Sequence, residues 1–299
     1  MAATSAKRWR RARVIDVREV AQHVRRIVLE PERLEAPAPP GSHIDIGVYV
    51  NGRADVRSYS VVGMSGYGTE LVLGVQLARQ SRGGSAYMHN LRRGQEVSIT
   101  QPLQNFPLNY GRPGYVLAAG GIGITAMVAM GKALKARGAA YRFVYGARSR
   151  DLMAFLDELV PEHGDRLDLR IDDEGSSLDV ADLVAGVPDG GELYVCGPTP
   201  MLDAIKAAWA QAASAASRPA DPTAAAGAAA AAPRRNTRRV ALGRLSTSLI
   251  ERPSVVFLCP APRCPFSGSG LAVAAHRSGS RPGPARRRSA PAAPWSPAA

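Results

Sequence analysis

Two glycine-rich turns carry the groups in this chain best suited to bind a nucleotide. One lies in residues 116–125 and the other in residues 192–201, and each follows an apolar run and precedes a helical pattern. Such turns present backbone N–H groups to a pyrophosphate. A single turn could equally end a strand for structural reasons, but the pair predicts a nucleotide at the carboxyl ends of a parallel sheet. The residues expected to bind its pyrophosphate, through backbone and hydroxyl groups, are Gly120, Gly121, Gly123 and Thr125.

A second candidate site lies upstream, at Arg57, Ser58, Tyr59 and Ser60. Alternate residues of a strand share a face, so Arg57 and Tyr59 should lie together. A guanidinium beside a phenol suits a phosphorylated aromatic ligand, because the guanidinium binds phosphate and the ring packs on the ligand. The alternative is a solvent-facing arginine beside a half-buried tyrosine.

Residues 82–85 form a further candidate for anion binding. They precede a short helical pattern at residues 86–91, with Ser85 as the expected N-cap. The N–H groups of residues 84–86 would then face an anion, and a plain cap without a ligand is the alternative. His89, in the same helix, is expected to pack or to lie at the surface, because no base or carboxylate adjoins it.

Two kinds of element must position these residues. From residue 13 to about residue 101 the chain predicts short strands, with Asn51-Gly52 as a two-residue hairpin turn, and hence a small antiparallel barrel. Further on, strands alternate with helices, which predicts a doubly wound parallel sheet with its switch point near Gly121 and Gly146. The strands are expected at residues 115–119, 141–145, 167–171 and 193–196, and the helices at 126–135, 152–159 and 178–184.

Taken in order, these four motifs resemble the ferredoxin–NAD(P)+ reductase superfamily, most closely its phthalate dioxygenase reductase and vanillate demethylase reductase branch. The resemblance covers about residues 10–210. It implies a flavin-binding barrel domain at residues 10–108 and an NAD(P)H-binding domain at residues 112–210. The remaining residues, 211–299, are called the tail here.

The resemblance also implies roles for single residues. Arg57 would contact the flavin phosphate, Tyr59 the ribityl chain or ring edge, and Ser60 the region of the isoalloxazine N5. The residues that would hold the phosphate of FMN are Gly83, Gly84 and Ser85. FMN is preferred over FAD because no adenine-binding element is evident. The nicotinamide would approach the flavin beside Cys196, Gly197 and Pro198, with Ser60 and Cys196 assigned to the catalytic step.

Cys196 is expected to position the nicotinamide rather than to act as a nucleophile, because no histidine and carboxylate accompany it. Plain burial is the alternative. The choice between NADH and NADPH rests on Arg148 and Arg150, which follow the second strand and suit a 2′-phosphate. The branch mostly uses NADH, so the preference is for NADH, with NADPH as the alternative.

The tail differs in composition from the rest of the chain. Its 89 residues carry 13 Arg, no Lys, one Asp and one Glu, so it holds +11 of the formal net charge of +13. Outside residues 242–258 it shows no helical or strand periodicity, which predicts disorder. A chain that ends at Gln211 is therefore expected to fold and to reduce artificial acceptors.

Members of the branch usually end with a ferredoxin module whose four cysteines hold a [2Fe–2S] cluster. The chain has three cysteines, and after Cys259 and Cys264 the third ligand position holds Ser267. These residues do not support the cluster, and no metal ligand is assigned. The composition of the tail is typical of GC-rich coding sequence translated out of frame, and a frameshift near residues 212–218 is our hypothesis.

The sequence thus predicts an NAD(P)H-dependent flavoprotein oxidoreductase that feeds electrons to a Rieske-type oxygenase. One alternative is a stand-alone NAD(P)H:flavin or dye reductase, and another is polyanion binding through the basic tail. No specific nucleic acid and no membrane are expected as partners. The chain starts without an apolar signal segment, so the cytoplasm is the expected compartment.

Overall fold

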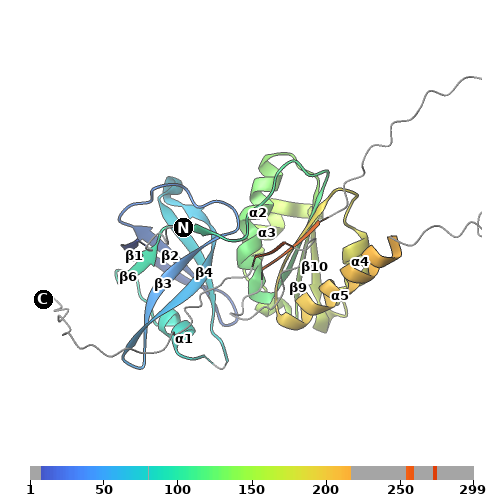
Figure 1. The fold of residues 1–299 in the computed structure, drawn as a ribbon. Coiled ribbons are helices and arrows are strands. Elements are labelled where there is room, and N and C mark those ends of the chain that lie inside the picture. Colours follow the sequence, from blue (N-terminus) through green and yellow to red (C-terminus); the bar gives the residue numbers. More distant parts are fainter. Residues whose placement is uncertain (1–7, 80, 217–253, 259–271, 275–299) are drawn as a thin grey trace, which may run out of the picture.

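The computed structural model describes residues 8–79, 81–216, 254–258 and 272–274. An antiparallel barrel comes first along the chain, and a parallel sheet with helices on both faces follows (Figure 1). The predicted fold class is therefore confirmed for these two parts.

The sheet has the strand order β4-β5-β2-β1-β6-β3-β7, and hydrogen bonds between β3 and β4 close the barrel. The two-residue turn between these strands is the predicted one, with positive φ at Asn51 (51°) and Gly52 (72°). Fifteen buried residues, among them Ile44, Ile46 and Leu73, fill the interior. The elements are β1 (Trp9–Ala21), β2 (Val24–Pro31), β3 (Ser42–Val50), β4 (Arg53–Ser65), β5 (Glu70–Gln76), α1 (Gly84–His89), β6 (Glu96–Thr100) and β7 (Leu103–Gln104).

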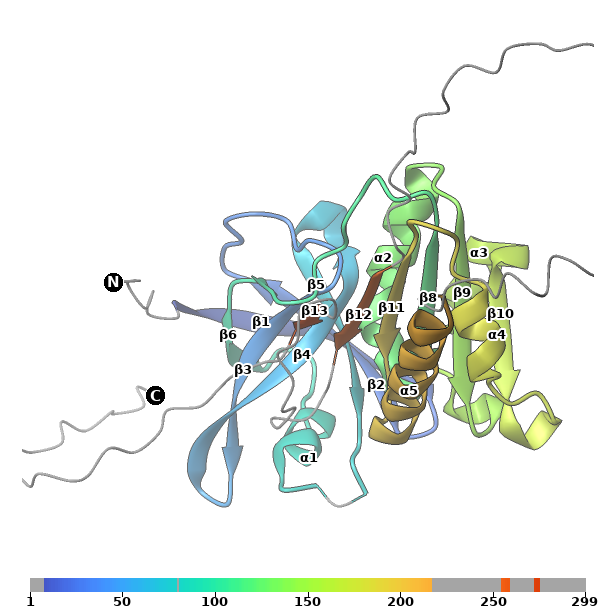
Figure 2. The same cartoon turned by 45° about the vertical axis from the view of Figure 1, so that its right-hand side comes forward.

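The second sheet has the order β10-β9-β8-β11-β12-β13, and all of its pairs are parallel. Helices α2 and α3 cover the face toward the barrel, while α4 and α5 pack on the other face (Figures 1 and 2). The elements are β8 (Tyr115–Gly120), α2 (Ile124–Ala136), β9 (Tyr141–Ala147), α3 (Leu156–His163), β10 (Leu167–Ile171), α4 (Val180–Ala185), β11 (Glu192–Cys196), α5 (Thr199–Ala216), β12 (Ser254–Leu258) and β13 (Ala272–Ala274).

Two strands of this sheet come from the tail. β12 lies within residues 242–258, the stretch excepted from the predicted disorder, whereas that prediction is wrong for residues 272–274 and for residues 211–216, which continue α5. β12 pairs with β11 from Glu192↔Ser254 to Cys196↔Leu258. Val255, Val256 and Phe257 are buried, and Phe257 is 0% exposed. The apolar run of β12 lies between β11 and β13, and burial of its side chains outweighs the weak local signal. The other residues of the tail, 217–253, 259–271 and 275–299, lie outside the described residues.

The barrel and the sheet meet where α2 packs on β4 and β5. Val62 and Val72 of the barrel share one buried cluster with Ile124, Met127 and Val128 of α2.

The predicted start of α3 near Leu152 is wrong, since the helix begins at Leu156. The cause is Phe155, whose positive φ of 65° interrupts the helical backbone and turns its buried ring toward the barrel strand β5 at Gly74.

Candidate functional site

The upstream site forms where Arg57 of β4 meets the start of α1. A Cβ on Gly84 would collide with Nε of Arg57 and lie 3.0 Å from its Cδ, so glycine is what allows this side chain to cross the backbone there. The guanidinium pairs with Asp55 (Nη1–Oδ2 2.7 Å). The pKa of Asp55 is lowered, first by the N–H of Val56 and then by Arg57. Arg57 and the turn at residues 83–85 are thus brought together, as the sequence predicted.

Ser58, Tyr59 and Ser60 continue along β4 but differ in environment. The hydroxyl of Ser58 donates to the buried carboxylate of Asp45 on β3 (2.5 Å). Tyr59 packs against the interior of the barrel, and burial raises the pKa of its phenol to about 12 although Arg57 opposes the shift. Ser60 pairs across the hairpin with His43 and is half-buried. Arg57 and Tyr59 lie on one side of the strand, and Ser58 on the other.

The N-cap of α1 differs from the sequence prediction. Gly83 occupies that position with φ 97°, a left-handed conformation that glycine adopts without strain, and the helical bonds begin with Tyr87 N to Gly83 O (2.8 Å). Ser85 is therefore inside the helix. Its hydroxyl bonds Ser81 Oγ (2.9 Å) and accepts from Ala78 N (3.2 Å), which fastens the preceding loop. The amides of residues 84–86 still precede the first helical bond.

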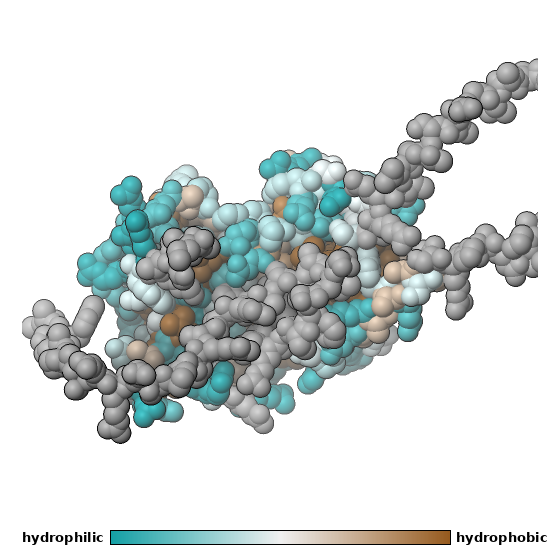
Figure 3. All heavy atoms as spheres, in the orientation of Figure 1, coloured by the Kyte–Doolittle hydropathy of each residue, from teal (hydrophilic) through white to brown (hydrophobic). Residues whose placement is uncertain are grey.

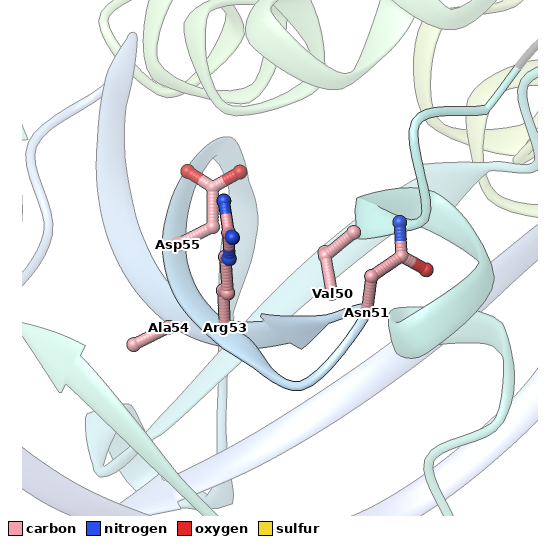
Figure 4. A pocket seen from close by; sticks show the side chains of 5 residues that line it. All are labelled: Val50, Asn51, Arg53, Ala54 and Asp55. Atoms are coloured by element: carbon pink, nitrogen blue, oxygen red, sulfur yellow. The ribbon is translucent and has the colours of Figure 1, made fainter.

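An open recess of about 510 Å³ adjoins this site at the β3–β4 hairpin. Figure 4 shows Arg53 and Asp55 side by side at its edge, and Asn51 on the opposite side. A Cβ on Gly83 would lie 2.5 Å from Val50 Cγ1, so the hairpin packs directly on the turn before α1. The recess, Arg57 and this turn form one polar region, which we call the phosphate cradle. Its lining residues are Val50, Asn51, Arg53, Ala54 and Asp55.

The two glycine-rich turns of the second sheet face each other, as predicted. β8 and β11 are adjacent, with Ala119 opposite Cys196. A Cβ on Gly123 would collide with the carbonyl oxygen of Cys196, and one on Gly120 would lie 2.8 Å from Pro198 Cδ. A Cβ on Gly197 would lie 2.8 Å from Met201 Sδ. The Gly123 contact is to backbone, whereas those of Gly120 and Gly197 are to the side chains of Pro198 and Met201, and glycine at all three positions allows the turns to approach.

Gly121 and Thr125 play different parts in the first turn. Gly121 has φ 51°, and a Cβ there would meet nothing within 4 Å, so the space where a side chain would stand is open. The hydroxyl of Thr125 donates to Ile122 O (2.9 Å), and a Cβ on Gly74 of the barrel would lie 2.7 Å from its methyl group. The predicted hydroxyl contact to pyrophosphate thus competes with a bond inside the turn. The side chain instead joins the turn to the barrel.

The two arginines after β9 also differ. Arg148 is exposed, and its carbonyl accepts from Asp173 N (3.0 Å). Arg150 forms two hydrogen bonds with Glu174, at 2.8 and 2.7 Å. Neither Glu174 nor Asp55 was singled out from the sequence. The run of three acidic residues after the strand at 167–171 was the available signal for Glu174.

Three further predictions concern His89, the cysteines and the membrane. His89 is half-buried, with Nε2 2.8 Å from Val75 O, and this confirms a packing role. Cys196 is buried. Cys259 and Cys264 lie outside the described residues. Within the described part of the chain, no helix is long and apolar enough to span a membrane. Polar residues cover much of the described surface on the face in Figure 3.

Comparisons with known proteins place these features among reductases. No family model matches the chain. The chain is 42% identical over 175 residues to phenoxybenzoate dioxygenase subunit beta of Ectopseudomonas oleovorans, which is 58% of this chain and 54% of that protein. It is 39% identical over 205 residues to tetrachlorobenzoquinone reductase of Sphingobium chlorophenolicum, or 66% and 62% of the two chains. The chain therefore spans little more than half the length of these relatives.

A solved structure of phthalate dioxygenase reductase is also similar. It matches with a TM-score of 0.57 and 26% identity, over 68% of this chain and 64% of that one. That reductase is described as a modular structure for electron transfer from pyridine nucleotides to [2Fe–2S]. The barrel and the parallel sheet therefore occur together in a known structure.

Proposed function

Because this chain belongs to the phthalate dioxygenase reductase and vanillate demethylase reductase branch of the ferredoxin–NAD(P)+ reductase superfamily, we propose that it is an NAD(P)H-dependent flavoprotein oxidoreductase. One observation carries the proposal. The phosphate cradle lies on β3, β4 and α1, the paired glycine turns lie at the carboxyl ends of β8 and β11, and α2 packs directly on β4 and β5 between them.

The flavin is assigned to the barrel. Arg57 and the amides of Gly84 and Ser85 would hold its phosphate, since a guanidinium and backbone N–H groups are the donors that phosphate prefers. Tyr59 would border the ribityl chain or ring, with Ser58 fixing the strand through Asp45 and Ser60 next to the ring N5. The fit is supported by the closeness of Arg57 to Gly84. A single phosphate cradle favours FMN over FAD.

The pyridine nucleotide is assigned to the parallel sheet. Gly120, Gly121 and Gly123 would bind its pyrophosphate through the backbone, and the open space at Gly121 supports this. Cys196, Gly197 and Pro198 would border the nicotinamide, with Arg148 near the ribose. Thr125 keeps the turn in place against Gly74, so its role is to position the turn relative to the barrel. NADH is the proposed coenzyme.

A flavin bound there would supply hydride acceptance from the nicotinamide and release of single electrons. The residues described here bind and orient both groups and need no proton transfer of their own. We further propose a Rieske-type oxygenase as the electron acceptor, on the strength of the similarity to phenoxybenzoate dioxygenase subunit beta and to phthalate dioxygenase reductase. Dyes and quinones are proposed as artificial acceptors of the same electrons. The cytoplasm is the proposed compartment.

A spectroscopic titration tests the proposed function. The purified full-length chain is loaded with FMN, freed of excess flavin and titrated anaerobically with NADH. We expect the flavin absorbance to bleach at a stoichiometry of about one, as hydride transfer requires. Failure to retain FMN or FAD, or a bound flavin that neither NADH nor NADPH bleaches, would refute the proposal.

A further inference from the structure

Charged side chains of both signs gather where β9 and β10 end. This is the edge at which a doubly wound sheet binds the 2′ oxygen of an adenosine ribose. Parallel pairing sets Ile171 of β10 beside Ala147 of β9, and the bond from Asp173 N to Arg148 O (3.0 Å) holds the two following loops together. The loops bring Arg148, Ser149, Arg150, Asp151, Asp172, Asp173 and Glu174 to this edge.

Arg150 binds Glu174 through the same two hydrogen bonds that it would need to bind a phosphate. Its Nε donates to Glu174 Oε1 (2.8 Å) and its Nη2 to Oε2 (2.7 Å). Two parallel bonds from a guanidinium are the arrangement that both carboxylates and phosphates accept. The pairing raises the pKa of Arg150 and lowers the pKa of Glu174, so both groups stay ionised at neutral pH. Glu174 therefore occupies the place of a 2′-phosphate on this side chain.

The surrounding charges also disfavour a 2′-phosphate. Ser149 donates its hydroxyl to the carboxylate of Asp151, and Ser177 donates to Asp172 (2.8 Å). Two arginines and four carboxylates give this edge a formal charge of −2. A dianionic 2′-phosphate would be repelled, whereas a ribose hydroxyl can donate to a carboxylate.

We propose that Glu174 determines the coenzyme preference by holding Arg150 away from the 2′ position, so that the site selects NADH over NADPH. The inference rests on the proposed function, because it takes the nucleotide to lie at the carboxyl ends of β8 and β9. It makes Glu174 a specificity-determining residue that acts through Arg150.

The first test measures binding without flavin chemistry. Isothermal titration calorimetry compares adenosine 2′,5′-bisphosphate with 5′-AMP on the full chain. In Glu174→Gln, affinity for the bisphosphate should rise at least about tenfold, the size of one charge-assisted hydrogen bond, with 5′-AMP unchanged. The gain should disappear in the double variant Glu174→Gln with Arg150→Ala. Glu30→Gln is the matched control, since Glu30 forms a similar exposed pair with Arg13 (2.8 Å) in the barrel.

The second test uses the FMN-loaded chain and the ratio of kcat/KM for NADPH to that for NADH. Glu174→Gln should raise this ratio at least about tenfold, and added salt should reduce the gain. An unchanged ratio, an equal gain in Glu30→Gln, or a gain that survives Arg150→Ala overturns the role of Glu174. If NADH still bleaches the flavin in that case, the proposed function stands. If neither coenzyme bleaches it, the proposed function fails, and the calorimetry still decides the binding preference.

Discussion

The phosphate cradle and the paired glycine turns are proposed to bind the same chemical group by opposite means. The cradle depends on a charged side chain, since Arg57 lies between Asp55 and the backbone of Gly84. The turns depend on absent side chains, since a Cβ on Gly120 or Gly123 would strike the facing turn. The first site can therefore be adjusted through charge and salt. The second can be altered only by disturbing the packing of the sheet that carries it.

The largest effect is expected where the packing of that sheet is removed. Phe257 of β12 is fully buried among residues of β8, β11, α4 and α5. Phe257→Ala should lower the free energy of unfolding by about 3–5 kcal/mol, measured by urea denaturation. Val160→Ala, at a side chain that is 48% exposed, is the control and should change little. A loss below about 1 kcal/mol would mean that β12 does not contribute to the sheet.

This strand also changes what is expected of a shortened chain. Cutting the chain at Gln211 would remove β12 and leave one edge of β11 unpaired. It would also expose the core residues that pack against Val255 and Phe257. The sequence-based expectation that such a chain folds unchanged is therefore replaced by an expectation of lower stability. Retention of flavin by the barrel is still expected, because every residue of the cradle precedes Tyr87.

The next effect distinguishes two glycines of one turn. Gly123→Ala places a methyl group against the Cys196 carbonyl and should cost about 1–3 kcal/mol through overpacking. Gly121→Ala meets open space, and its cost of about 1–2 kcal/mol comes from the positive φ alone. Calorimetry with 5′-AMP and thermal unfolding should show that Gly123→Ala is the more damaging. The reverse order would contradict the packing of the turns described here.

Removing the positive charge of Arg57 and removing the negative charge of Asp55 should have opposite effects on the affinity for FMN. Arg57→Ala should weaken FMN about ten- to a hundredfold, because a charge-assisted hydrogen bond contributes about 1.5–3 kcal/mol. Asp55→Asn removes the carboxylate that competes for Arg57 and should tighten FMN, by at most about fivefold for so exposed a pair. Fluorescence titration at low and high salt measures both changes. If Asp55→Asn weakened FMN as much as Arg57→Ala, the pair would be structural and the cradle misassigned.

The sequence predicted the elements with clear local signals and missed those that depend on distant contacts. The hairpin at Asn51-Gly52 and the apolar strands before each glycine turn were recognisable, since turn chemistry and burial act locally. The left-handed Gly83 and Phe155 were not, because their conformations are stabilised by Val50 and by the barrel at Gly74. β12 joins the sheet from more than fifty residues beyond β11, where no local pattern indicates its partner.

For the candidate site, residue types were easier to predict than their partners. Arg57 and Arg150 are both recognisable as phosphate ligands, and the sequence offers no reason to treat them differently. Only the structure shows that Glu174 binds Arg150 through both oxygens while Asp55 holds Arg57 through one ion pair at the edge of an open recess.

The smallest expected effect is a pH dependence located in the packing of α2 on α3. His163 is 5% exposed, with Nδ1 2.8 Å from the Tyr141 hydroxyl and its ring against Phe143. Burial lowers the pKa of His163, and Glu162 opposes this shift while Lys135, Lys132 and Arg166 add to it. Below pH about 6.5 the unfolded chain takes up a proton that the folded chain resists, so stability should fall as the pH drops from there toward the folded pKa.

His163→Phe should remove this contribution, because a phenyl ring of similar size cannot be protonated. The unfolding free energy of the wild-type chain minus that of the variant should be constant above pH about 7. It should then fall on acidification with a slope of at most about 1.4 kcal/mol per pH unit, as for one proton. Taking the difference cancels His89, whose pKa burial also lowers. A difference that stays flat down to pH about 5 would show that His163 is not kept neutral by burial, and that the packed half of the molecule tolerates a charge there as readily as the exposed cradle does.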